Sequence, residues 1–312
     1  WVDLGKLTGG QAPEPIAACL KKMDVKPEAG EIPLWMDAFK VSLENLVLEA
    51  GVTLVYASLP TEAVVAGGAI RGVVIGNKSG RQVVLGRLVL DATSTAVAAR
   101  VAGAEFEPER PGDFRFIRMM ELTGVGPLEQ KTLTVPAELG IAGNNLTVHH
   151  GYLGRAHVLI ECPMELKMGK LDLEGMMQRE IESRHRTMRV AVHLIQNVPA
   201  FKEAKLAICA YELDGPQTTR LAGPAPGWMA EFKGIDLAFS DKNQDQVRLP
   251  LGNFAGPVRS LWCLDEAARL EAPRRDLLRD PVNAALAGAA FAKILVPKLG
   301  TGEITPVMAT TY

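Results

Sequence analysis

Cysteine and histidine are scarce in this chain of 312 residues, and neither is arranged for cross-linking or metal binding. The four cysteines are far apart and form no C-x-x-C pair: Cys19, Cys162, Cys209 and Cys263. We therefore expect buried free thiols, without a disulfide framework or a zinc site. Two of the five histidines, His149 and His150, are adjacent on an expected strand. Their side chains should point to opposite faces, so we expect no metal site there either.

Long apolar runs, a strong net charge and the common hydrolase motifs are also absent. No apolar run approaches the roughly 20 residues that span a bilayer, and the formal net charge is −2. We expect a soluble protein, favour the cytoplasm, and expect neither nucleic acid nor an anionic membrane as partner. Without G-x-S-x-G, H-E-x-x-H or G-x-x-x-x-G-K-[ST], hydrolase and P-loop functions have no support. The chain begins at Trp1, from which we expect processing or a lost preceding segment.

Apolar spacing and glycine turns predict the elements of the first hundred residues. A helix is expected from about Glu14, and a second, amphipathic helix over 36–50 is indicated by apolar steps of three and four residues. The stretch 52–60 reads as a buried strand, and a meander of short strands with glycine turns follows over 63–85. Residues 87–91 then form a strand that runs through a tight turn into a small-residue helix over 94–101.

The pattern changes after residue 108. We expect a strand at 114–121, a hairpin of 145–150 with 155–162, a long helix capped by Asp172, and a strand at 204–213. Residues 221–246 look loop-rich, and a strand at 260–265 and a helix at 280–296 end the fold. In the long helix one stripe is expected to pack in the core: Met177, Ile181, Met188 and Ile195.

The order helix, strand, meander and "LVLDATS" strand–helix turn resembles the middle of the FAD-dependent oxidoreductases of the glutathione-reductase-like flavoprotein class. "SLWCLDEAARL" and "DPVNAALAGAAFAKIL" resemble the last strand and flavin-facing helix of that class. The resemblance implies an α/β fold: an incomplete FAD-binding domain, with a parallel sheet and a β-meander, and an inserted α+β substrate or cap domain. We expect the FAD-binding part at 1–107 and 255–312 and the inserted domain at 108–254.

The resemblance also implies FAD as cofactor and indicates which residues would approach it. These cofactor-binding candidates are Leu59, Asp91, Ala92, Thr93, Ser94, Asp265, Asn283 and Gly288. Plain structural roles remain open: Asp91 could merely cap the following helix, and Gly288 could permit close helix–sheet packing. Ser94 stands where the family has glycine, and Leu264-Asp265-Glu266 stands where it has a small-residue step.

The opening strand of the family, its G-x-G-x-x-G turn and its acidic ribose ligand are missing from this sequence. Two functions remain open. The chain is an FAD-dependent oxidoreductase, or a subunit of one, that moves hydride between flavin and a small organic substrate, with the missing half on a partner chain or a lost segment. Alternatively, it is a flavin-less subunit that uses the fold for assembly. In both cases we expect either another protein chain as partner or a missing N-terminal segment, because parallel sheets are rarely left open.

No residue can be assigned as the catalytic base from the sequence. His149 and His157 are candidates for proton transfer on the substrate side, because a neutral imidazole exchanges protons near pH 7. Arg220 is a candidate for orienting a substrate carboxylate. The alternatives are polar strand positions for the two histidines and an ion pair for Arg220.

Overall fold

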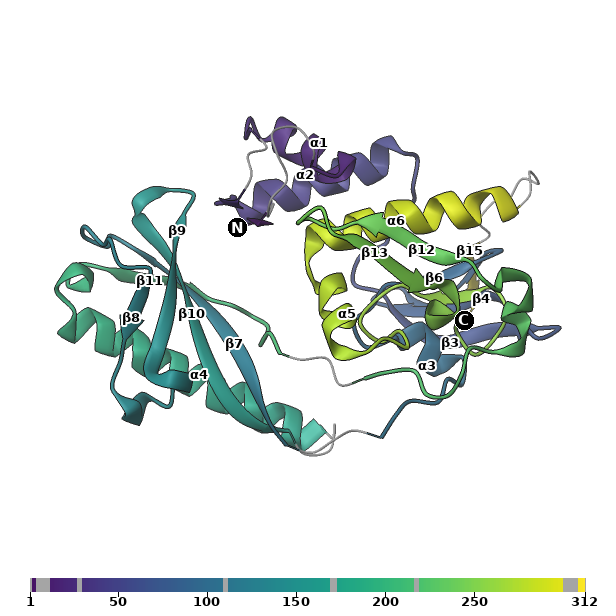
Figure 1. Cartoon of the computed structure of the whole chain (residues 1–312). Coiled ribbons are helices and arrows are strands. Elements are labelled where there is room, and N and C mark those ends of the chain that lie inside the picture. The colour runs from purple at the N-terminus through teal and green to yellow at the C-terminus, as the bar shows by residue number, and fades with distance from the viewer. Residues whose placement is uncertain are drawn as a thin grey trace. The chain divides into compact units, whose positions relative to one another are not determined.

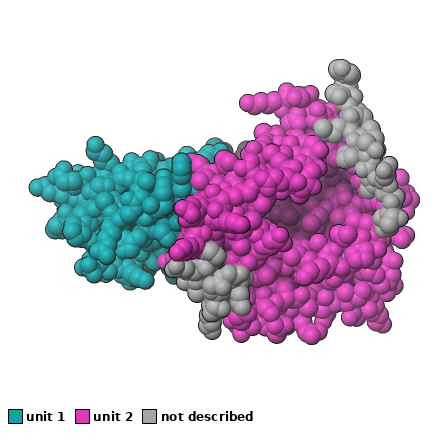
Figure 2. Space-filling model, turned by 90° about the horizontal axis from the view of Figure 1, so that it is seen from above, with its two compact units in different colours: residues 1, 33–35, 108–218 teal, residues 2–32, 36–107, 219–312 magenta. Residues whose placement is uncertain are grey.

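The computed structural model describes residues 2–3, 12–26, 30–108, 112–168, 173–215, 219–299 and 308–311. The chain divides into two compact units (Figures 1 and 2). Unit 1 holds residues 1, 33–35 and 108–218, and unit 2 holds residues 2–32, 36–107 and 219–312. None of the helices described is long and apolar enough to cross a membrane.

Unit 1 is an antiparallel sheet with one long helix against it (Figure 1). Its strand order is β11-β7-β10-β9-β8, with β7 at Gly112–Thr123, β8 at Thr132–Thr134, β9 at Asn145–Gly151, β10 at Gly154–Met168 and β11 at Lys205–Cys209. The helix α4 spans Leu173–Asn197 and is followed by a short turn of helix, η3, at Pro199–Phe201; η1 (Ala137–Leu139) and η2 (Ala142–Asn144) precede β9. Even-numbered residues such as Met120 and Ile160 pack with Leu194 of α4. The odd-numbered residues therefore lie on the sheet face turned away from α4.

A fully buried arginine ties three elements of unit 1 together. Arg118 on β7 donates from Nη2 to Glu180 Oε2 of α4 at 2.6 Å and to Ser183 Oγ at 2.9 Å. Its Nη1 donates to the carbonyl oxygen of Ala210, just past β11, at 2.7 Å. Because a buried charge is tolerated only when it is paired and hydrogen-bonded, this network fixes α4 and β11 against β7.

Unit 2 combines an antiparallel meander with a short parallel pair. The meander consists of β3 (Leu59–Ala66), β4 (Ala69–Asn77) and β5 (Gly80–Leu85), with β15 (Met308–Thr311) beside β5, and the parallel pair is β6 (Val89–Asp91) with β14 (Leu261–Cys263). The helices are α1 (Glu14–Lys22), α2 (Met36–Glu49), α3 (Val97–Val101), α5 (Ala272–Asp276) and α6 (Pro281–Leu295). Val2–Asp3 and Glu31–Ile32 form a further small pair, β1 and β2. The parallel sheet and meander implied by the family resemblance are thus present.

The expected buried strand at 52–60 is wrong. Residues 52–58 form no strand, and β3 begins only at Leu59. Val52 and Tyr56 are exposed, at 51% and 65%. Within the described residues no strand pairs with this stretch, so its backbone gains nothing from extended pairing, and its apolar side chains stay in contact with solvent.

The stretch 219–254 packs in unit 2, not in the inserted domain where we placed it. It contains a hairpin that the sequence analysis missed, β12 (Asp236–Ser240) with β13 (Gln246–Pro250). Leu237 and Leu249 of this hairpin are fully buried in one core with Trp262 and Phe291. This shared apolar core moves the boundary to residues 218 and 219. Alternating apolar residues in "DLAFS" and "QVRLP" were the available signal.

Three of the four α4 residues that we expect to pack in the core do not do so. Met177, Ile181 and Met188 are about half exposed, because the buried face of α4 runs through Val190, Ala191 and Leu194 instead. Asp172, the predicted cap of this helix, lies outside the described residues.

Replacing Arg118 with alanine should destabilise unit 1 by about 3 kcal/mol or more, because Glu180 and two carbonyl groups lose their buried partner. Arg115→Ala on the same strand is the matched control. Arg115 is exposed, so its loss should change the free energy of unfolding by less than about 0.5 kcal/mol. Urea unfolding of both variants measures the difference. Equal effects would show that the network has no special role.

Candidate functional site

The carboxyl ends of β6 and β14 lie side by side in unit 2. The two strands pair in parallel, with Asp91 in register with Cys263, and the Leu264 amide donates to the Asp91 carbonyl oxygen at 2.9 Å. In open α/β sheets ligands bind where parallel strands end, because the following turns present free backbone groups there. The pairing brings together the Asp91–Ser94 turn and Asp265.

The Asp91 carboxylate is fully occupied by its own turn. Oδ1 accepts from the Thr93 amide at 3.1 Å and from the Thr93 hydroxyl at 2.6 Å, and Oδ2 accepts from the Ala99 amide at 3.0 Å. The Thr93 hydroxyl in turn accepts from the Val97 amide at 3.0 Å. Asp91 therefore holds the turn and the start of the following helix in place. This is the structural, capping role that the sequence left open. Ala92 and Ser94 are exposed, and their amides make no hydrogen bond within the described part of the chain.

In contrast to Asp91, Asp265 has one carboxyl oxygen without a hydrogen-bond partner among the described residues. Oδ1 accepts from the Ala267 amide at 2.5 Å, whereas Oδ2 is buried without a hydrogen-bond partner among the described residues. Burial, helped by the neighbouring Asp91 and Glu266 charges and opposed by the hydrogen bond from the Ala267 amide, raises the pKa of Asp265 to about 8. The site therefore holds a carboxyl group whose second oxygen lacks a hydrogen-bond partner among the described residues.

Helix α6 carries the next two candidates. Asp280 caps the helix by accepting from the Val282 and Asn283 amides. The Asn283 side chain is buried, and its Oδ1 accepts from the Lys242 amide at 2.8 Å, so this group serves the fold. A Cβ added at Gly288 would meet no atom within 4 Å. Close packing therefore does not explain this glycine. Leu59, at the start of β3, is 58% exposed.

Unit 1 brings the two candidate histidines to the same face of its sheet. His149 Nε2 lies 3.0 Å from Glu161 Oε1, and His157 Nε2 lies 3.7 Å from Glu121 Oε2. His149 is in register with Leu159, and Glu121 pairs with that same residue from β7. All four side chains therefore lie on the face turned away from α4. Both imidazoles are buried, and both glutamates are partly exposed.

Aromatic rings enclose the His157 side chain. Tyr152 packs edge-on against it at 5.3 Å between centroids, and Trp35 stacks on Tyr152 at 6.0 Å. A Cβ at Gly151 would come within 2.0 Å of His157 Nδ1, so only glycine fits there. The sequence analysis missed Glu121 and Glu161 as partners of the two histidines. The period of two along the predicted strands could have placed them on one face, but the register between strands was needed to pair them.

Arg220 serves as an ion-pair centre in unit 2. Its guanidinium pairs with Glu107 and, at 2.8 Å, with Glu271, and these hydrogen bonds raise its pKa. The Arg220 carbonyl also accepts from the Glu107 amide at 2.8 Å. The contacts of Arg220 are therefore those of an ion pair, the structural role that the sequence left open. Across the residues that the structure describes, no group of three or more histidine, cysteine, aspartate or glutamate side chains is placed to hold a metal ion.

The buried Asp265 carboxyl should make the ligand-free protein less stable as pH rises from 5 to 8. In this window the unfolded side chain is ionised, since its pKa is about 3.9, while the folded one keeps its proton up to a pKa of about 8. The folded state then binds more protons, so stability falls by up to about 1.4 kcal/mol per pH unit.

Asp265→Asn should flatten this profile, whereas Asp37→Asn, at an exposed position, should leave it unchanged. Urea midpoints at pH 5, 6, 7 and 8 measure the slopes. A slope that survives in the Asp265→Asn variant contradicts the assignment.

Three solved structures are similar to this chain at low identity and with TM-scores below 0.5: a geranylgeranyl bacteriochlorophyll reductase-like protein from Thermoplasma acidophilum (14% identity, TM-score 0.47, 84% of this chain and 58% of that one), p-nitrophenol 4-monooxygenase from Pseudomonas putida (10%, 0.45, 86% and 57%) and anhydrotetracycline hydroxylase from Streptomyces rimosus (11%, 0.47, 96% and 57%). The chain thus spans less than two thirds of each. No curated protein sequence matches it. The model of the FAD dependent oxidoreductase family matches residues 17–224, about two thirds of the chain, and the chain belongs to that family.

Proposed function

We propose that this chain binds FAD at the carboxyl ends of β6 and β14 and takes part in oxidising or reducing a small organic substrate. The unpaired Asp265 Oδ2 carries the proposal. A buried polar atom without a partner costs roughly 1–3 kcal/mol. FAD has hydroxyl groups along its ribityl chain and ribose, and one of these could supply the missing partner, since a hydroxyl both donates and accepts hydrogen bonds.

Two further features of unit 2 are compatible with a bound cofactor. Gly288 has open space where a side chain would stand, so a ligand could approach the helix backbone. The amides of Ala92 and Ser94 are without partners among the described residues and could donate to cofactor oxygens. Bound FAD would supply the hydride chemistry, and the protein would supply binding, orientation and electrostatics.

For the substrate side we propose the two histidine–glutamate pairs of unit 1. In each pair a carboxylate lies beside Nε2 and orients the ring. Either ring could then hold a proton at Nε2 and deliver it to a substrate oxygen, with the glutamate stabilising the charge. His157 is buried, with the Tyr152 ring packed against it, and this exclusion of water strengthens such an interaction.

A second function has one observation in its favour. Because the Asp91 carboxylate is consumed by its own turn, the "DATS" segment is stable without any ligand. A flavin-less subunit of a larger complex, with FAD absent or shared with a partner chain, would be built in this way. Whether this chain binds FAD decides between the two functions.

Gly288→Leu should lower the affinity for FAD at least tenfold while leaving the fold intact, since no atom within 4 Å opposes the new Cβ. Its stability should even rise by a few tenths of a kcal/mol to about 1 kcal/mol, because glycine is a poor helix former. Ala289→Leu, at an exposed position on a different face of the same helix, is the matched control and should retain FAD.

Titration of each apo-protein with FAD, followed by flavin fluorescence, measures the affinities. Asp265→Ala should weaken binding in the same way, through loss of the buried acceptor. Equal FAD affinity in the wild type and both variants contradicts the proposed site.

A further inference from the structure

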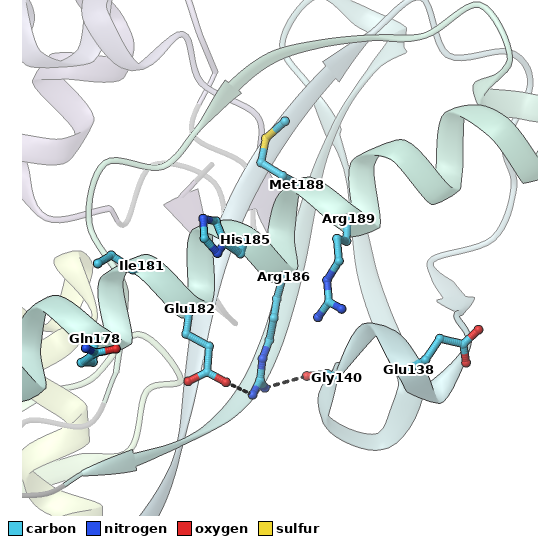
Figure 3. Close-up of a pocket in the computed structure, with 9 residues that line it drawn as sticks. All are labelled: Glu138, Gly140, Gln178, Ile181, Glu182, His185, Arg186, Met188 and Arg189. Atoms are coloured by element: carbon cyan, nitrogen blue, oxygen red, sulfur yellow. Dashed lines mark hydrogen bonds and ion pairs between the residues drawn. The ribbon is translucent and has the colours of Figure 1, made fainter.

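Helix α4 exposes an apolar stripe on the side that the sheet of unit 1 does not cover. The α4 stripe consists of Met177, Ile181, Met188 and Val192, whose exposed fractions lie between 46% and 54%. In Figure 3 Ile181 and Met188 project from the helix with His185 between them. Large apolar side chains that share one helix face and remain half exposed mark an interaction surface more often than chance.

The spacing of the α4 stripe is symmetric. Its members follow one another at steps of four, seven and four residues, with the midpoint between Arg184 and His185. An identical helix that runs in the opposite direction therefore presents the same pattern. Met177 then faces Val192 of the second copy, and Ile181 faces Met188. Apolar residues repeating at four- and seven-residue steps are suited to packing against a second helix.

Charged residues along one edge of the α4 stripe also become complementary when the second copy of the helix runs in the opposite direction. Glu182 and Arg189 project from α4 toward the turn that holds Gly140, and an open hollow of about 890 Å³ lies beside them (Figure 3). Arg189 is exposed and has no ion-pair partner within the described chain. Glu182 is 52% exposed, and among the described residues it pairs through Oε1 alone, with Arg186. In the reversed copy Arg189 comes to nearly the same level as Glu182, so each arginine meets a carboxylate across the interface.

We propose that α4 packs antiparallel against α4 of a second copy of this chain, with the two-fold axis passing between Arg184 and His185. The α4 stripe forms the centre of the contact, and the Glu182–Arg189 pairs flank it twice. An isologous contact of this kind closes on itself and yields a dimer rather than a fibre. The proposal does not depend on FAD, so its outcome is independent of the proposed function.

Disulfide trapping tests both the dimer and its direction. His185→Cys lies beside the axis and should form a covalent dimer on mild oxidation, seen on a non-reducing gel. Met177→Cys is equally exposed, but its two copies would be about 22 Å apart along the helices at 1.5 Å per residue, and it should not link. The unsubstituted chain is the control for Cys209, since the other native cysteines are buried. Equal linking by both variants, or linking by neither, overturns the antiparallel contact.

Sedimentation velocity of the full chain at tens of micromolar should show a dimer. Ile181→Glu with Met188→Glu should shift it to a monomer, whereas Ile208→Glu, an exposed apolar position on β11 outside the stripe, should leave the dimer intact. Glu182→Arg and Arg189→Glu should each weaken the dimer at least threefold, and the double charge swap should restore it. A wild-type monomer, as expected if another part of the chain or a different protein covers the stripe, overturns the proposal.

Discussion

The parallel pairing of β6 with β14 is the constraint on which the rest of the structure depends. It joins two segments that are far apart in the sequence, and residues 108–218, the main part of unit 1, are inserted between them. Leu261, Trp262 and Cys263 are buried as a result, and Trp262 anchors a group of edge-on aromatic contacts that includes Phe232 and Phe291. Because parallel strands end on the same edge of a sheet, this pairing also decides which side chains meet there.

The two aspartates at that edge differ in how their carboxyl groups are hydrogen-bonded. Asp91 is satisfied by three hydrogen bonds from its own turn, whereas Asp265 receives one and keeps a buried oxygen without a described partner. The first stabilises the fold. The second costs free energy in the ligand-free protein, and such costs concentrate at binding sites. Together they explain how one edge can be both a rigid turn and a place that a ligand would complete.

Local patterns in the sequence identified most of the regular elements. The apolar period of α2, the glycine turns between β3, β4 and β5, and the hairpin of β9 with β10 all depend on residues close in the chain. What failed depends on distant partners. The stretch 52–58 has the composition of a strand, but no described strand pairs with it. The hairpin β12–β13 was hidden in a loop-rich composition, and its burial comes from the core around Trp262.

The candidate sites show the same limit. The family resemblance located the β6 turn, Asp265 and Gly288, but only the structure separates an occupied carboxylate from an unpaired one. Strand period placed His149 correctly, yet its partner Glu161 required the register of β9 against β10. The alternation along β7 places Arg118 on the same, apolar side as Phe116 and Met120. Its hydrogen bonds to α4 depend on the tertiary structure and could not be predicted from the sequence.

The most direct test of FAD binding is the visible absorption spectrum of the native protein as purified, recorded before and after denaturation, with the released compound identified by its mass. The account predicts the two visible bands of an oxidised flavin, and FAD released on denaturation in a ratio near one per chain. A featureless spectrum from folded protein that also fails to take up added FAD would contradict it, and would leave the family fold in a role other than flavin binding.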